Sequence, residues 1–156
     1  MERRIVMLYT KLTKKAMKLS FEAHKNQTDK NGMPYIFHPI HLAEQMVGEE
    51  CICVALLHDV VEDTDMTFEQ LEQEGFPAEV IEALKLMTHD KSVPYMDYIK
   101  NIRSNHIAAE VKLADLRHNS DLTRLDAVDE KALRRYEKYQ QAIALLETYV
   151  TEENRT

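Results

Sequence analysis

The sequence is poor in the residues that make turns, with 3 Gly and 4 Pro among 156 residues. A many-stranded sandwich or barrel needs a turn after every short strand, so this composition disfavours both. Trp is absent, and no apolar run approaches the ~20 residues that a membrane-spanning helix needs. With 44% hydrophobic and 30% charged residues, we expect a folded helical protein with no membrane partner.

Basic residues are also in deficit, with 20 Lys and Arg against 27 Asp and Glu and a formal net charge of −7. Such a surface repels a phosphate backbone, so we expect no nucleic-acid polymer as partner. Only two cysteines occur, and Cys51 and Cys53 stand too close to bridge each other within a helix. They indicate buried thiols in a reducing compartment, and a cytoplasmic protein.

The hydrophobic periodicity predicts one all-α domain over residues 1–156, a bundle of about seven to eight helices. The N-terminal apolar stretch is broken by Lys11 and Lys14, which indicates an amphipathic helix and not a signal peptide. The expected helices cover residues 5–25, 39–47, 50–61, 67–75, a segment from 77, a segment from 94, 107–118 and a segment from 129. On the last of these, Tyr136, Tyr139 and Tyr149 are expected in the core or at a contact between subunits of a homo-oligomer.

The start of the helix at Thr67 has the clearest local signal. Gln70 lies three residues later, as a capping box requires, and Met66 and Leu71 occupy the two positions of a hydrophobic staple. Pro77 and Pro94 suit the first turn of the two helices that follow, and Asp129 is a good N-cap for the last helix.

The most apolar stretch of the chain contains a histidine next to an aspartate, His58 and Asp59. A desolvated pair of this kind needs a compensating partner or a metal ion. The dipeptide alone is more simply explained as a pair at a helix end that is hydrogen bonded to the backbone.

Two further acidic residues favour the metal site over this simpler explanation. Glu62 follows His58 by four residues, and Asp63 follows Asp59 by four, so all four side chains would share one broad face of a helix or of its C-terminal end. Carboxylates at a helix C-terminus oppose the helix dipole, and a bound cation explains them better than a solvated helix end. Metal ligands with carboxylates one turn away are the groups that metal-assisted hydrolysis uses.

Four blocks of sequence together resemble the hydrolase domain of the RelA/SpoT family, within the HD-domain phosphohydrolases. The resemblance is strongest over residues 16–125, and no synthetase domain fits in this length. The blocks are 23–27 (AHKNQ), 32–39 (GMPYIFHP), 55–64 (ALLHDVVEDT) and 112–115 (KLAD). The resemblance implies a cytoplasmic, manganese-dependent hydrolase that acts in the stringent response and removes the 3′-pyrophosphate from guanosine tetra- and pentaphosphate.

The resemblance also implies the roles of individual residues. His38, His58, Asp59 and Asp115 would hold the ion, and this mixed ligand set suits Mn²⁺, Fe²⁺ or Zn²⁺ better than Mg²⁺ or Ca²⁺. Glu62 and Asp63 would handle the attacking water and the leaving group. Lys30 and Asn119 would contact the small-molecule nucleotide substrate, and Lys112, Arg117 and Arg124 are further cations for its phosphates.

One position departs from the family, which has an arginine where this chain has Asp29. An acid cannot replace a guanidinium that contacts a nucleotide. The departure therefore leaves more than one nucleotide possible as the substrate, but it does not change the expected reaction class. An HD-domain phosphatase for another nucleotide, such as NADPH or a nucleoside monophosphate, is the second hypothesis. A non-catalytic nucleotide-sensing module is the third, although it would have no use for Glu62 and Asp63.

Overall fold

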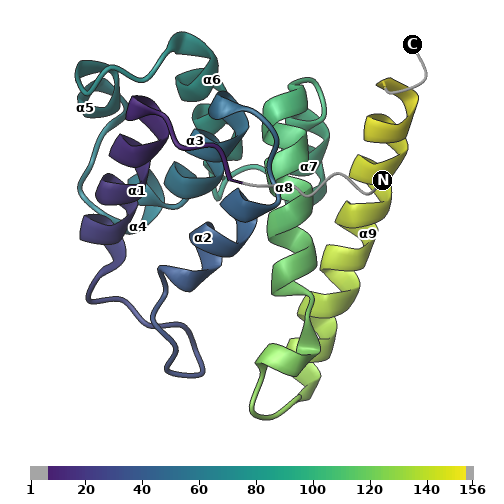
Figure 1. Cartoon of the computed structure of the whole chain (residues 1–156). Helices are drawn as coiled ribbons and strands as arrows, with labels where there is room; N and C mark the ends of the chain where they lie inside the picture. The colour runs from purple at the N-terminus through teal and green to yellow at the C-terminus, as the bar shows by residue number, and fades with distance from the viewer. Residues whose placement is uncertain (1–6, 154–156) are drawn as a thin grey trace, which may run out of the picture.

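The computed structural model describes residues 7–153, with side chains to residue 150, and within them every regular element is a helix (Figure 1). The expected all-α class is therefore confirmed. The elements are α1 (Lys11–His24), α2 (Phe37–Glu44), α3 (Glu49–Leu57), α4 (Val60–Asp63), α5 (Phe68–Gln73), α6 (Ala78–Met87), α7 (Tyr95–Ile102), α8 (His106–Asn119), the 3₁₀ turn η1 (Leu122–Arg124) and α9 (Glu130–Glu153). Within the same described range, no helix is long and apolar enough to cross a membrane.

Local capping sets several helix ends. The capping box at Thr67 is present as predicted, because its hydroxyl accepts from the Gln70 N–H and the Gln70 side chain accepts from the Thr67 N–H. Asp129 likewise accepts from the Ala132 N–H at the start of α9. The first helix begins at Lys11 and not at residue 5, because Thr10 forms a second capping box there. Residues 1–6 lie outside the described part of the chain.

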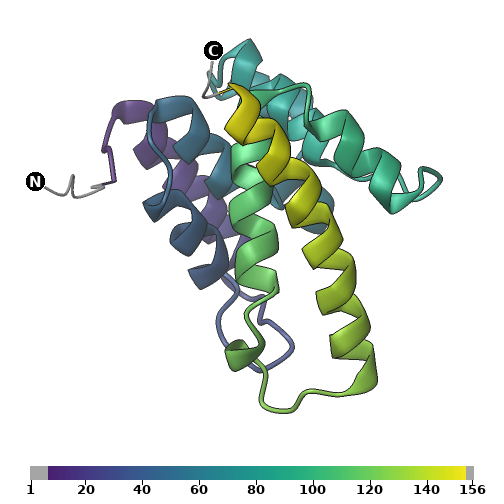
Figure 2. The same cartoon turned by 90° about the vertical axis from the view of Figure 1, so that its right-hand side faces the viewer.

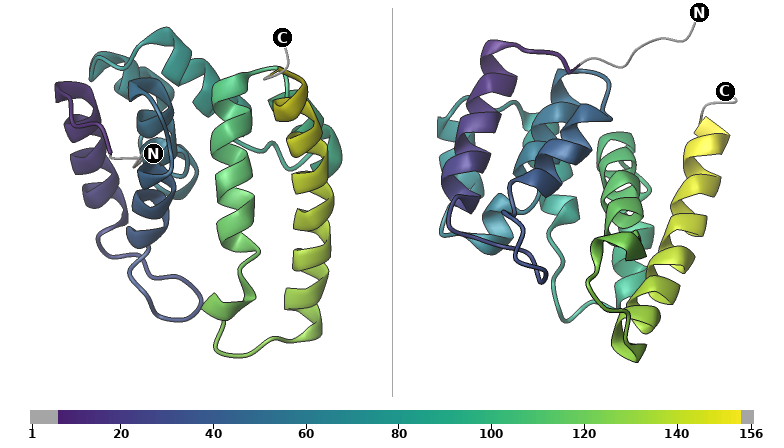
Figure 3. Two further views of the ribbon diagram at one scale, coloured as in Figure 1. Left: turned by 45° about the vertical axis from the view of Figure 1, so that its right-hand side comes forward. Right: turned by 60° about the horizontal axis from the view of Figure 1, so that its bottom comes forward.

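Helix α3 forms the centre of the bundle. Its residues from 51 to 57 are all buried, and α3 packs against α1, α2, α6 and α8 (Figures 1 and 3). Cys51 and Cys53 are buried free thiols in this helix, as expected, and burial raises the pKa of both to about 12. An apolar helix surrounded in this way is a core helix, and its surroundings fix the position of its C-terminal end.

The helix expected over residues 50–61 is interrupted. Helix α3 ends at Leu57, and α4 begins at Val60, with the Asp59 backbone at φ −102° and ψ −3° between them. Consecutive side chains of a regular helix point about 100° apart. The break brings these two adjacent side chains together, with His58 Nε2 2.9 Å from Asp59 Oδ2.

Helices α8 and α9 run side by side along one flank of the bundle (Figures 1 and 2). The α1–α2 loop and the η1 loop lie next to each other at one end, where the Asp126 N–H donates to Asn31 Oδ1 at 3.1 Å. Figure 3 shows both loops at the same end of the molecule. This end carries the cavity described below.

Candidate metal centre

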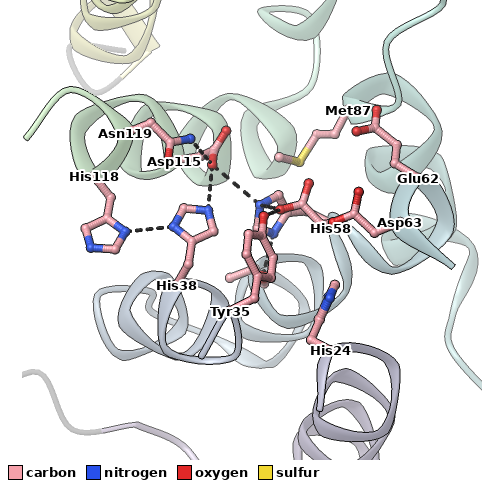
Figure 4. Close-up of polar contacts among 12 residues, drawn as sticks. His24, Tyr35, His38, His58, Glu62, Asp63, Met87, Asp115, His118 and Asn119 are labelled. Atoms are coloured by element: carbon pink, nitrogen blue, oxygen red, sulfur yellow. Dashed lines mark hydrogen bonds and ion pairs between the residues drawn. The ribbon is translucent and has the colours of Figure 1, made fainter. Parts of the chain in front are cut away.

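Four side chains from three places in the chain lie close together, and Figure 4 shows three of them, His38, His58 and Asp115. His38 comes from α2, His58 and Asp59 come from the break between α3 and α4, and Asp115 comes from α8. Asp115 Oδ1 lies 2.9 Å from His38 Nε2 and 3.5 Å from His58 Nε2. Ligand atoms of His38, His58 and Asp115 all lie within 4.8 Å of one another. The structure thus brings three of the four predicted ligands close enough to share one ion, and it places the fourth, Asp59, against His58.

The His58 ring shows that these residues fit a cation. Its Nδ1 is 2.7 Å from the Ala55 carbonyl oxygen, to which it donates, so in the neutral ring Nε2 carries a lone pair. That buried Nε2 makes no hydrogen bond, although Asp59 Oδ2 and Asp115 Oδ1 face it. A lone pair set against two carboxylates requires a proton or a cation between them. A histidine that donates its second ring N–H to a backbone carbonyl is the usual arrangement of a metal ligand.

Both carboxylates of the centre are held ionised. Burial raises the pKa of Asp59, but the positive charge of a protonated His58 ring lowers it by more, to a net value of about 2. Burial also raises the pKa of Asp115, and the Lys112 ammonium lowers it by more, so the pKa of Asp115 ends well below its ordinary value. Asp59 also accepts a hydrogen bond from the Tyr35 hydroxyl. Ionised carboxylates beside imidazoles form a suitable ligand set for a divalent transition metal.

Lys112 forms an ion pair with the Asp115 oxygen that does not face the imidazoles. Its Nζ lies 2.9 Å from Asp115 Oδ2, and its side chain is 14% exposed. Sequence reasoning offered Lys112 as a contact for substrate phosphates, and this was wrong because the ammonium group is buried against Asp115. Asn119 donates from Nδ2 to Asp115 Oδ1 at 3.0 Å, so this predicted substrate contact lies at the edge of the centre.

His118 is a site residue that sequence reasoning missed. Its Nδ1 lies 2.7 Å from Nδ1 of His38, the two rings are stacked, and burial lowers the pKa of His118 to about 4. Its position could have predicted this role, because His118 follows Asp115 by three residues and therefore lies on the same face of α8. The ring of His41 in turn contacts the ring of His118, with centroids 4.2 Å apart.

Glu62 and Asp63 lie on the α4 side of the centre, opposite His118 (Figure 4). Glu62 Oε1 accepts from the His89 N–H at 2.9 Å, and partial burial raises the pKa of Glu62. Asp63 Oδ2 accepts from Gln27 Nε2 at 3.2 Å. Each carboxylate keeps a second oxygen that could accept from water. The same Gln27 pairs through Oε1 with His24 Nδ1 at 2.8 Å.

A cavity of about 320 Å³ adjoins the centre. Both predicted substrate contacts, Lys30 and Asn119, line it, and so do Tyr35 and His38 of the centre. Burial lowers the pKa of Lys30, with further contributions from Arg135 and Lys131, which shows that cations gather on this wall. The remaining lining residues are Gln27, Thr28, Asp29, Asn31, Asp121, Arg124, Leu125, Arg135 and Tyr139. A ligand with several negative charges suits such a wall beside a metal site.

These features define the class of protein: an all-α domain whose His and Asp side chains, brought from three places in the chain, can hold a divalent metal. The sequence pattern of the HD domain family matches residues 16–119, and the chain belongs to this family.

Several relatives match about two thirds of this chain. The chain is 43% identical over 117 residues to the guanosine-3′,5′-bis(diphosphate) 3′-pyrophosphohydrolase MESH1 of Danio rerio, which covers 66% of this chain and 64% of that protein. It is 38% identical over 120 residues to the Mus musculus protein of the same name, covering 67% and 66%. The bifunctional (p)ppGpp synthase/hydrolase SpoT of Escherichia coli is 35% identical over 127 residues, which are 18% of its length.

One solved structure is similar over nearly the whole chain. It is described as a metazoan orthologue of SpoT that hydrolyses ppGpp and plays a role in starvation responses, and it matches with a TM-score of 0.71 and 26% identity. The match covers 95% of this chain and 96% of that one. The chain therefore has the fold of that protein, while it spans under two thirds of the Danio rerio relative.

Proposed function

We propose that this chain is a divalent-metal-dependent phosphohydrolase that removes the 3′-pyrophosphate from guanosine 3′,5′-bis(diphosphate). The observation that carries the proposal is the buried His58 Nε2, which faces two ionised carboxylates beside a cavity with a cationic wall. The relatives named for this reaction support the choice of substrate. Free buried thiols at Cys51 and Cys53 support a cytoplasmic location.

In this proposal His38, His58, Asp59 and Asp115 hold the ion, and the mixed nitrogen and oxygen ligands favour Mn²⁺, with Fe²⁺ or Zn²⁺ as alternatives. A divalent ion there polarises the phosphoryl oxygens and lowers the pKa of bound water. Lys112 keeps Asp115 ionised and oriented. Tyr35 orients Asp59 through the hydrogen bond that its hydroxyl group donates to the carboxylate.

Glu62 and Asp63 are proposed to orient the attacking water and to exchange its proton. The water oxygen bonds to the phosphorus attached to the 3′ oxygen, the bond between that phosphorus and the 3′ oxygen breaks, and the 3′ oxygen takes up a proton. Partial burial raises the pKa of Glu62, which brings it closer to that of a useful general base. Lys30 and Asn119 bind the nucleotide from the wall of the cavity.

The test is to incubate the manganese-loaded protein with a panel of nucleotides and to identify the products by mass spectrometry. We expect guanosine 5′-diphosphate and pyrophosphate in equal amounts from guanosine 3′,5′-bis(diphosphate). Release of phosphate from NADPH or from a nucleoside monophosphate instead would move the protein to the second hypothesis. Nucleotide binding without release of phosphate or pyrophosphate from any member would establish the sensing module and refute the enzyme.

A further inference from the structure

Arg124 stands between two hollows next to the metal centre. It lines the cavity that contains Lys30 and Asn119, and it also lines a second hollow of about 350 Å³ bordered by Phe37 and His41. Its side chain is 28% exposed, so part of it remains available to a ligand. Arg124 is the last residue of η1, on the loop that lies against the α1–α2 loop.

The edges of the Arg124 guanidinium are held by the protein. Nη1 donates to the His118 carbonyl oxygen at 2.9 Å and lies 3.5 Å from Asn119 Oδ1. Nη2 lies 3.7 Å from Asp29 Oδ2. A guanidinium that is oriented through its edges in this way can pack one of its planar faces on a ring.

Asp29 is itself fixed. Its Oδ1 accepts from the N–H groups of Asn31 at 2.8 Å and Met33 at 3.0 Å, which closes the turn of the α1–α2 loop. The carboxylate therefore sits in one place, with its second oxygen turned to Arg124. This oxygen offsets the charge of the guanidinium and would repel a phosphate group placed there.

The cavity is thus divided by charge. Lys30 and Arg135 form a cationic wall, whereas the Arg124 side has its charge offset by Asp29 and is continued by the apolar Leu125. Phosphate groups favour the first wall, and a flat, uncharged ring favours the second.

We propose that Arg124 determines specificity by stacking its guanidinium on the nucleobase of the substrate, and that Asp29 is the positioning residue that holds it there. This inference rests on the proposed function for the identity of the nucleotide. It assigns the base to the η1 side of the cavity and the 5′-phosphates to the side of Lys30 and Arg135.

The test measures binding of two probes to the manganese-loaded protein by isothermal titration calorimetry. Guanosine 5′-diphosphate carries a base but no 3′-pyrophosphate, and pyrophosphate carries no base. In Arg124→Ala and in Arg124→Lys we expect a loss of roughly threefold to thirtyfold in affinity for guanosine 5′-diphosphate, with pyrophosphate affinity unchanged. Lysine keeps the charge without the plane, so it should not rescue binding.

Asp29→Asn keeps acceptors for the turn but removes the ion pair, so we expect a smaller loss in the same direction. The matched control is Arg134→Ala, because Arg134 is an exposed arginine of α9 that is paired with Glu130 and does not line the cavity. Thermal melting of each variant verifies that it is folded.

Three results would overturn the inference: normal binding by Arg124→Lys, an equal loss for pyrophosphate, or no binding of guanosine 5′-diphosphate by the unaltered protein. The readout does not depend on turnover. If the base contact is observed while guanosine 3′,5′-bis(diphosphate) is not hydrolysed, the proposed reaction fails and the role of Arg124 stands.

Discussion

Asp115 shows how neighbouring groups fix the orientation of a single carboxylate at the proposed metal site. One oxygen, Oδ2, pairs with Lys112 at 2.9 Å, and the other, Oδ1, faces both imidazoles and the Asn119 amide. Because Lys112 holds the carboxylate from behind, Oδ1 keeps a fixed direction toward the centre. Outer partners of this kind typically affect metal affinity tenfold to hundredfold.

We therefore predict that Lys112→Met weakens manganese binding by about 10- to 100-fold. The variant keeps the volume of the side chain but leaves Asp115 buried without its cation, which raises the pKa of Asp115 toward its ordinary range. Calorimetric titration with Mn²⁺ measures the effect. Lys100→Met, which changes an exposed lysine of α7, is the control. Unchanged affinity in Lys112→Met would show that Asp115 needs no support.

Glu62 is predicted to act in turnover and not in holding the ion. Glu62→Gln keeps an acceptor for the His89 N–H, so the loop contact survives while the base is lost. We expect full metal content and a kcat lower by about 10²- to 10⁴-fold. A loss below roughly tenfold would show a structural role only.

The same residue sets a pH dependence. Partial burial raises the pKa of Glu62 above its ordinary 4.5, so the side chain takes up its proton at a higher pH than a free carboxyl does. Activity that requires the carboxylate should fall as the pH decreases through this raised pKa. The residual activity of Glu62→Gln should lack this acid limb, and a pH profile of kcat for both proteins measures the difference.

At the scale of elements, the sequence predicted most helix starts but not the interruption after Leu57. Capping signals are local, and Thr67 and Asp129 acted as predicted. At the break, His58 and Asp59 contact Asp115 and Tyr35, which reach the site from other parts of the chain and which no local signal could reveal. The start of α1 at Thr10 was missed because the third residue of its capping box is Thr13, not the usual Glu or Gln.

The capping box of α5 gives an element-scale prediction. Thr67→Ala removes the acceptor for the Gln70 N–H, and we expect a loss of about 1 kcal/mol in the free energy of unfolding. Thr148→Ala in the exposed middle of α9 is the control, and Ala should be neutral or favourable there. Urea denaturation of both variants measures the difference, and equal stabilities would contradict the role of the cap.

The two loops beside the cavity were the least predictable element. From the sequence, Asp29 was only a departure from the family. The structure shows that Asp29 closes its own turn and pairs with Arg124, 95 residues away in the chain. Asp29→Arg would remove the acceptor that closes this turn and set two guanidinium groups against each other, so restoring the family's arginine does not suit this chain.

For the whole molecule, the four predicted ligands come together because α2 and α8 pack on each other and on the buried α3. The family resemblance supplied His38 and Asp115, since nothing local marks either residue as a ligand. The roles of Lys112 and His118 became visible only in three dimensions. The assignment of residues 1–156 to a single domain stays a prediction.

Metal removal should therefore affect the entire fold. An ion that binds the folded chain alone stabilises it by about 2.7 kcal/mol at one hundred times its dissociation constant, which corresponds to a shift of roughly 5–10 °C in Tm for a chain of this size. We expect chelation with EDTA to lower Tm by this order and added Mn²⁺ to restore it. His58→Ala should melt at the same temperature with and without EDTA, and a continued response would place the ion elsewhere.

The most direct test of the central claim, that these four residues hold the ion, is the metal content of the purified protein. Manganese-loaded protein is freed of unbound metal and analysed by elemental mass spectrometry, alongside His58→Ala, Asp59→Ala and the control His106→Ala at the exposed start of α8. We expect roughly one ion per chain in the unaltered protein and the control, and almost none in the two site variants. Full occupancy in either site variant, with its fold intact by circular dichroism, would contradict the assignment.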